Sequence, residues 1–394
     1  FNTFSDLLGA SHDIDARTQL SPFRGLSVGL SWRTAWSSSE EIDFRILGEG
    51  DPIDPGDPDD PDDPFRRASA PGDIERSVGR RSGSGESTVF SFGGGYRDVV
   101  EAHVARYQRD SGRPPTEAGQ IPSEFLSPTG YAADFTSILS RGMGAFGPNG
   151  LFQIPVPNWT VSYSGLERLP LLRAVANQIS LQHGYSATAQ TQFATIFDPG
   201  SRTSEYNGQT FASAAALAED GFDEPTSVTV NERFQPLIGV TFGFKGNIQT
   251  SFSTNRTSLM TLNTPSASVY EKTSRDLRVD LSYARTGLSL FGLRGLNNNI
   301  RFQLTALVAG DETSTGLPLQ QDVLNLLDDD PETGFTPTTP QQTSRLQISP
   351  QISYTVSNQV TANLLAQYER TDSEISGQTN RFTGGVSLRI LFSN

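Results

Sequence analysis

The sequence contains no cysteine, and no run approaches the roughly 18 consecutive apolar residues of a transmembrane helix. Without cysteine, these residues can form neither a disulfide nor a thiolate metal site, and redox chemistry indicates no compartment. The mean hydropathy is also negative, at −0.37. A helical membrane span is therefore excluded. Membrane strands are compatible with this composition, because only every second residue of such a strand faces lipid.

The formal charge of −14 is concentrated in two acidic segments. Residues 49–63 contain eight acids and residues 311–332 contain seven, with no lysine or arginine in either segment. The remaining 29 acids are balanced by 30 bases, of which only Lys245 and Lys272 are lysine. The low pI of about 4.7 therefore describes two loops and not the whole surface.

Strict alternation of apolar and polar residues is the dominant pattern. One example has apolar Leu277, Val279, Leu281 and Tyr283 alternating with Arg278, Asp280 and Ser282. Residues 248–262 and 267–285 exceed the five to six or so residues of a soluble strand and match the about 9 to 11 residues of a tilted membrane strand with an overhang. A soluble sandwich also alternates, but these lengths favour an all-β fold, a transmembrane antiparallel β-barrel. We expect Arg278, Asp280 and Arg389 to face its lumen.

Composition divides the chain into segments. We predict barrel strands in 1–47, an acidic proline-rich disordered loop in 48–86, a barrel strand in 87–96, a helical insertion in 97–156, and barrel strands in 157–394 with long loops at 197–230 and 310–341. Bacterial barrels have short periplasmic turns and longer outer loops. With a periplasmic C-terminus, the turns at 245–247 and 357–358 are periplasmic and both long loops lie outside. Upstream of residue 235 the order is unclear, since 48–86 and 95–156 cannot both be outer loops if one strand separates them.

Two segments differ in kind from the strands. In 51–64, acids are spaced by prolines that hold the chain extended, which predicts disorder. Calcium binding is the alternative reading of so many carboxylates, but it would need a loop that wraps them around the ion. In the insertion, a set of residues recurs at helical spacing, namely Val99, Val100, His103, Val104 and Tyr107.

The sequence offers no constellation for catalysis. His12, His103 and His183 are scattered without metal-ligand spacing, and we expect all three to be structural. There is no nucleophile elbow, and the triple glycine at 93–95 lacks the lysine of a phosphate-binding loop. We therefore expect no enzyme activity, no cofactor, no bound metal and no nucleic-acid partner.

The last predicted strand ends in an alternating apolar run, Val386, Leu388, Ile390 and Phe392. This arrangement is expected of the final strand that a barrel presents to the assembly machinery. An ordinary terminal strand is the alternative interpretation.

The stretch IPVPNWTVSYSGLERLP carries a family resemblance. Its prolines hold the chain extended, Asn158 can cap a turn and Trp159 suits a membrane interface. It resembles the PxPNW…Y.GL segment of the SprA/Sov family, and the matching residues are Pro155, Pro157, Asn158, Trp159, Tyr163, Gly165 and Leu166. The segments 180–190, 236–257 and 348–371 are similar to later family segments in the same order, whereas the acidic tract and the long loops depart from the family.

The resemblance implies the C-terminal part of an outer-membrane barrel of about 36 strands, of which about 12 fit in this chain. Members of the family are translocons that export folded proteins in type IX secretion, and gliding-motility adhesins use the same exit in some of them. The implied partners are the other part of the same barrel, a small PorV-type barrel, a plug protein, cargo with a C-terminal signal domain, and the lipid and lipopolysaccharide of the cell outer membrane. Because the sequence begins at Phe1 without a signal segment, we expect the targeting signal to lie outside these residues.

Two other functions are compatible with the same alternation of apolar and polar residues. One is an outer-membrane porin or nutrient transporter, which a complete gene of porin length would favour. The other is a secreted β-rich adhesin, which solubility after carbonate washing would favour. The translocon hypothesis requires energy from another component, because the sequence contains no nucleotide-binding motif.

Overall fold

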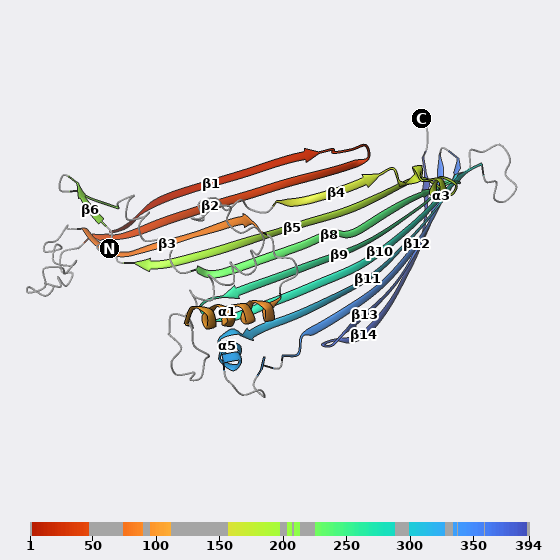
Figure 1. Cartoon of the computed structure of the whole chain (residues 1–394). Helices are drawn as coiled ribbons and strands as arrows, with labels where there is room; N and C mark the ends of the chain where they lie inside the picture. Colours follow the sequence, from red (N-terminus) through yellow and green to blue (C-terminus); the bar gives the residue numbers. More distant parts are fainter. Residues whose placement is uncertain are drawn as a thin grey trace, which may run out of the picture.

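The computed structural model describes residues 2–46, 74–89, 95–111, 157–197, 203–206, 209–212, 225–287, 299–327, 334–336, 338–357 and 359–391. Twelve strands form one antiparallel sheet (Figure 1). They are β1 (Asn2–Leu20), β2 (Leu26–Ile46), β3 (Ile74–Thr88), β4 (Asn158–Ser164), β5 (Ala176–Phe197), β8 (Pro225–Phe244), β9 (Ile248–Asn263), β10 (Ser268–Thr286), β11 (Asn299–Pro318), β12 (Gln341–Ser357), β13 (Val360–Ser373) and β14 (Gly377–Ile390). A separate hairpin contains β6 (Thr203–Tyr206) and β7 (Gln209–Ala212).

The strands follow one another across the sheet in sequence order, from β1 at one edge to β14 at the other. Every pairing is antiparallel, which confirms the all-β antiparallel prediction and the expected number of strands in this chain. Within the described residues, β1 and β14 do not pair with each other, so the sheet is an open wall. The size of a complete barrel stays a prediction.

The strand ends fall into two groups, which define a turn end and a loop end of the wall (Figure 1). At the turn end, three residues join β8 to β9, where Gly246 and Asn247 have φ of +91° and +63°. This left-handed backbone favours glycine and asparagine, which confirms the predicted turn at 245–247. The short connection from β12 to β13 lies at the same end.

Strands β3 and β4 share one position in the wall, and this resolves the upstream order. Both pair antiparallel with β2 on one side and β5 on the other. Along β2, partners run from Ile74 to Ser87 and then continue from Asn158 to Tyr163. The chain therefore leaves the wall partway across it and later resumes the same strand in the same direction, so 95–156 is not a loop between successive strands.

Several predicted boundaries are wrong because the strands are longer than expected. Strand β3 begins inside the predicted loop 48–86 and ends at Thr88, within the predicted strand 87–96, of which residues 90–94 lie outside the described residues. Strand β8 begins inside the predicted loop 197–230, which also holds the β6–β7 hairpin; β11 extends nine residues into the predicted loop 310–341. The extensions of β3 and β11 are mainly polar, so periodicity did not mark them, and the extension of β8 contains only the short alternating pair Val228 and Val230, which is buried. Backbone pairing with neighbouring strands stabilises all three extensions.

The helices lie in the connections. They are α1 (Tyr96–Ser111), the 3-10 turn η3 (Leu166–Arg168), α3 (Pro170–Arg173) and α5 (Leu319–Leu327). Helix α1 occupies the first residues of the predicted helical insertion. The acidic tract 51–64 and residues 112–156 of the insertion lie outside the described residues.

Candidate functional site

One face of the wall carries an apolar band along the half of each strand nearer the turn end. Strand register places Val240, Phe252, Val279, Ala306 and Ile348 side by side on this face. Exposed apolar residues of the same face include Leu277, Val308, Leu364, Val386, Leu388 and Ile390, and Val386 is 78% exposed. The band covers 300–308, 346–354 and 360–368 on β11, β12 and β13. Runs of this length match the about 9 to 11 residues with which a tilted strand crosses a bilayer.

Aromatic side chains flank the band on both sides. Nearer the turn end, β8, β10, β11 and β12 contribute Phe244, Tyr283, Phe302 and Tyr354. On the other side, the rings of Trp159 and Phe234 lie 4.3 and 4.9 Å from that of Tyr185. Such aromatic girdles mark the two membrane interfaces of transmembrane barrels.

The opposite face is polar. Asp280 accepts hydrogen bonds from Arg278 (Nε to Oδ2, 2.8 Å), Thr305 (Oγ1 to Oδ1, 2.6 Å) and Ser251 (Oγ to Oδ2, 3.3 Å). Exposed Arg389 lies on the same face, opposite Thr361 of β13. The structure thus brings the three predicted lumen residues onto one face, and the lumen itself stays a prediction.

Two side chains, those of Thr88 and Asn158, form hydrogen bonds across the junction of β3 and β4. We call these two residues and their backbone partners, Arg33 and Ala187, the seam. The Thr88 hydroxyl accepts a hydrogen bond from the Arg33 backbone N–H (2.7 Å) and donates one to the Arg33 carbonyl (2.9 Å). On the other side, Asn158 Oδ1 accepts from the Ala187 N–H (2.8 Å) and the Ala187 carbonyl accepts from the Val89 N–H (3.1 Å). These bonds replace the ladder that a continuous strand would supply.

The predicted role of Asn158 as a turn cap is wrong. Residues Asn158–Ser164 form β4, which re-enters the wall between two strands, so no turn stands at Asn158. The backbone group that lacks a ladder partner there is the N–H of buried Ala187, and the Asn158 amide oxygen satisfies it.

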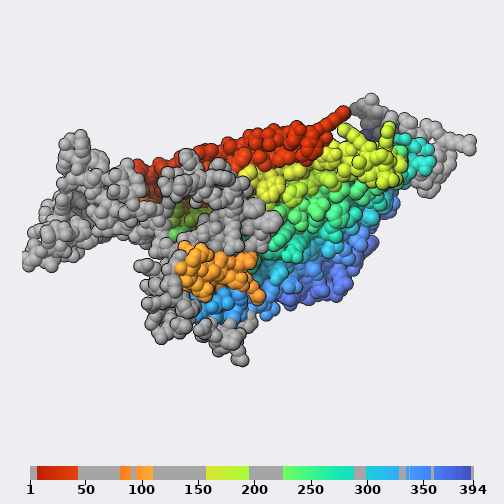
Figure 2. Space-filling model, viewed as in Figure 1, coloured from red at the N-terminus to blue at the C-terminus, as the bar shows by residue number. Residues whose placement is uncertain are grey.

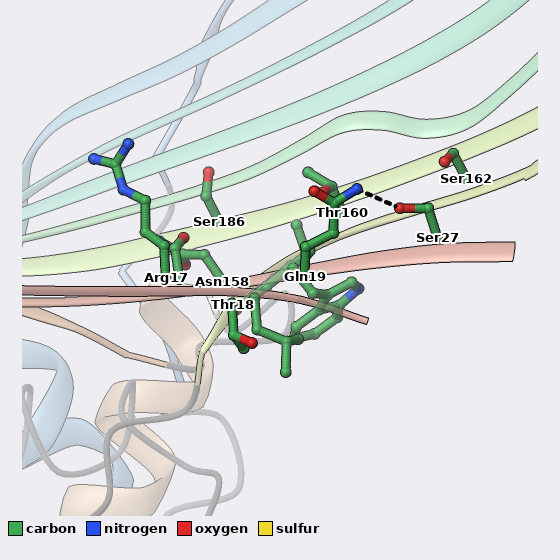
Figure 3. A pocket seen from close by; sticks show the side chains of 13 residues that line it. Arg17, Thr18, Gln19, Ser27, Asn158, Thr160, Ser162 and Ser186 are labelled. Atoms are coloured by element: carbon green, nitrogen blue, oxygen red, sulfur yellow. Dashed lines mark hydrogen bonds between the residues drawn. The ribbon is translucent and has the colours of Figure 1, made fainter. Parts of the chain in front are cut away.

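A pocket of about 600 Å³ opens at the seam. Figure 3 shows polar side chains from β1, β2, β4 and β5 converging on it, with Arg17, Asn158, Thr160 and Ser186 among those labelled. Gln19 Nε2 donates to the Ser27 hydroxyl at 2.9 Å (Figure 3). Strand alternation puts these polar side chains on the polar face, whereas Leu30, Trp159 and Tyr185, which also line the pocket, lie in register on the apolar face.

The seam gives the first testable prediction. Replacing Asn158 by alanine removes the acceptor of the buried Ala187 N–H, at a cost of about 1–3 kcal/mol in local opening. Hydrogen exchange followed by mass spectrometry is expected to show faster exchange in 180–190, by roughly tenfold for each 1.4 kcal/mol. Thr160→Ala, an exposed substitution on the same strand, is the control and leaves exchange there unchanged. Equal exchange rates in both variants would show that the Asn158 side chain does not stabilise this part of the sheet.

The other motif residues are spread along β4 and its exit. Trp159 lies on the apolar face in the aromatic cluster, and the Tyr163 ring meets Phe23 edge-on at 6.4 Å. Gly165 has φ +124°, which only glycine adopts readily, and Leu166 begins η3. Pro155 lies outside the described residues, and Pro157 directly precedes β4. The motif therefore builds the re-entry into the wall and not a catalytic site.

The predicted terminal strand is the edge strand β14. Val386, Leu388 and Ile390 lie exposed on its apolar face, and Phe392 lies outside the described residues. The edge position agrees with a terminal strand, and its role in assembly stays a prediction.

A helical cover lies on the apolar face at the loop end, made of α1 and α5. Figure 2 shows α1 (orange) against α5 (light blue), and the two helices contact each other. Their buried side chains include Val99, Val100, Val104, Leu319 and Val323, which pack in one core with Val230, Met260, Leu262 and Val269 of the sheet. The helices thus remove from water the apolar residues that lie beyond the band.

A buried carboxylate joins the two helices of the cover. Asp322 of α5 is 0% exposed and accepts from the Tyr96 hydroxyl of α1 and from the Thr336 backbone N–H (2.6 Å) and hydroxyl. The Arg97 guanidinium lies 5.0 Å from the ring centre of Phe335. Sequence analysis missed α5, although Leu319, Val323 and Leu327 have helical spacing.

The histidines show no shared site. His103 is buried in the cover, and His183 Nδ1 lies 2.6 Å from the Leu237 carbonyl oxygen. Across the described ranges, no group of three or more histidines and acids could hold a metal ion. The helices of those ranges are too short or too polar to cross a bilayer.

The strand pairing and the two unlike faces define the class: this chain is a wall of transmembrane β-barrel construction. No protein-family model matches the sequence, and neither does any curated protein. Solved structures similar to it include a loop-deletion form of OmpT, an outer membrane protein of Vibrio cholerae (8% identity, 98% of this chain and 99% of that chain, TM-score 0.23). Another is the beta domain of the Bordetella autotransporter BrkA (8% identity, 98% and 92%, TM-score 0.22). TM-scores this low establish no common architecture, so the fold class rests on the strand pairing itself.

Proposed function

We propose that this chain is the C-terminal wall of an outer-membrane translocon that exports folded proteins in type IX secretion. The observation that carries the proposal is the open wall with one apolar and one polar face, whose two edges do not pair with each other. Unpaired edges inside a bilayer are costly, because their backbone N–H and C=O groups have no water to bind. Further strands must therefore continue the sheet on both sides, which widens the enclosed pore.

The polar face suits the passage of folded cargo. Its charges are compensated locally, as in the Arg278–Asp280 pair, and its neutral positions carry amides and hydroxyls such as Gln303, Gln351 and Asn363. A surface rich in such groups stays hydrated and disfavours adhesion of a folded protein. The resemblance of 154–166 to the SprA/Sov family supports the same reading.

The proposal assigns partners to each surface. The edges β1 and β14 meet the other part of the same barrel, and the apolar band meets the lipid and lipopolysaccharide of the outer membrane. A PorV-type small barrel, a plug protein and cargo with a C-terminal signal domain complete the assembly. Transport is noncovalent, so the proposal assigns no catalytic residue or cofactor.

Depletion of the full-length protein in its native host tests this function. Mass spectrometry of secreted and surface proteins is expected to show loss of those that share a C-terminal signal domain, with their accumulation in the periplasm. A strain re-expressing the full-length protein is the control and restores export. Unchanged export together with reduced uptake of small solutes would replace the translocon by a porin or nutrient transporter.

A further inference from the structure

The connection from β4 to β5 lies against the apolar face at the turn end (Figure 1). Gly165 N–H donates to the Ile179 carbonyl (3.4 Å), and the Ile179 N–H donates to Glu167 Oε2 (3.2 Å). Ile179 and Ala176 belong to the apolar face and are buried where η3 and α3 contact β5. The connection is thus docked onto the wall by backbone hydrogen bonds and by apolar packing.

The outward side of this docked segment is also apolar. Leu171 is 88% exposed, and Leu169 and Val175 are each more than half exposed. Transfer of such side chains from water into a hydrocarbon environment is favourable in proportion to the apolar area removed from water. The segment lies at the turn end of the strands that carry the band, because η3 and α3 contact β5, and Leu181 of β5 pairs with Val240 of β8 within the band.

Charge at the turn end is mainly positive, unlike the acidic segments of the loop end. The described connections at this end carry Arg24, Arg168, Arg173 and Lys245 against the single acid Glu167. The carboxylate of Glu167 is engaged within the segment: its own backbone N–H lowers its pKa, desolvation opposes this, and the backbone N–H of Ile179 and the positive charge of Arg168 lower the pKa further. It therefore stays ionised near neutral pH and leaves Arg168 and Arg173 exposed beside the leucines.

From this geometry we propose that η3 and α3 form an interfacial anchor that binds anionic phospholipid at the turn end of the wall. Leu169, Leu171 and Val175 enter the acyl chains, and Arg168 and Arg173 bind headgroup phosphates. An apolar side with flanking arginines is the pattern of segments that lie in the plane of the interface. The proposal rests on the membrane orientation of the proposed function.

Fluorescence quenching of the full-length protein tests where Leu171 lies. Leu171→Cys carries an environment-sensitive fluorophore in vesicles of phosphatidylcholine with phosphatidylglycerol, and Leu281→Cys of the band is the matched control. We expect lipids spin-labelled near the headgroup to quench Leu171→Cys and aqueous iodide to quench it weakly. Quenching of Leu171→Cys by iodide while Leu281→Cys responds to spin-labelled lipid would overturn the anchor alone. Iodide quenching at both positions would overturn the membrane orientation as well.

Lipid preference tests the arginines separately. Native mass spectrometry of the full-length Arg168→Gln/Arg173→Gln variant is expected to show less bound phosphatidylglycerol, by about fivefold for each arginine. Arg109→Gln, exposed at the end of α1, is the control and retains the bound lipid. Equal phosphatidylglycerol binding by all three proteins would overturn the role of Arg168 and Arg173.

Discussion

Leu281→Arg is expected to abolish accumulation of the folded protein in the outer membrane. Leu281 lies in the apolar band opposite Leu304, at the middle of the 300–308 run. An arginine on the lipid face at the bilayer midplane destabilises the inserted barrel by about 2–4 kcal/mol. Quantitative immunoblotting of outer-membrane fractions, with trypsin resistance as the folding criterion, measures the effect.

The neighbouring substitution Ser282→Arg is the matched control. Ser282 lies on the polar face, where it pairs with Gln303 of β11, so an arginine there remains hydrated. We expect folded protein at close to the wild-type amount. Equal loss of folded protein in both variants would mean that an arginine in this part of β10 disrupts packing, and that lipid contact at Leu281 is not the cause.

Asp322→Ala is expected to release the helical cover from the wall. The substitution leaves the Tyr96 hydroxyl and the Thr336 N–H without their buried acceptor. A buried donor left unsatisfied costs about 1–3 kcal/mol, so a combined loss of about 3 kcal/mol raises the open population by roughly two orders of magnitude. Limited proteolysis of the full-length protein is expected to cut within 96–111 and 319–327 correspondingly faster.

Gln320→Ala provides the comparison, because Gln320 is exposed on the same helix. Its cleavage rate is expected to equal that of the wild type. Unchanged proteolysis of Asp322→Ala would show that apolar packing alone holds α1 and α5 in place and that the buried carboxylate contributes little.

The strands with an apolar face were predictable from the sequence because lipid contact imposes a period of two. Residues 248–262 and 267–285 became β9 and β10 to within one residue at each end. The same alternation placed Arg278, Asp280 and Arg389 on one face. Where the outer surface leaves the proposed membrane, this constraint ends. The mainly polar extensions of β3 and β11 carried no periodic signal, and that of β8 carried only the short pair Val228 and Val230.

Long-range arrangement was not predictable from local pattern. Sharing of one position by β3 and β4 depends on β2 pairing with residues 53 positions away in β3 (Thr34 with Ser87) and 127 positions away in β4 (Ser31 with Asn158), which no window of sequence encodes. The same holds for Asp322 and Tyr96, which are 226 residues apart. Asn158 illustrates the limit well, because its chemistry as a backbone acceptor was foreseen while its partner was not.

Cysteine accessibility along β10 tests the two-faced wall most directly, and these 394 residues contain no cysteine of their own. Single cysteines replace Leu277, Arg278, Val279 and Asp280 in turn, in full-length protein in the native outer membrane, with any cysteine elsewhere in that protein removed. A membrane-impermeant maleimide is expected to label positions 278 and 280 and to leave 277 and 279 unlabelled. Equal labelling of all four positions would contradict a wall with one face in lipid and the other in water.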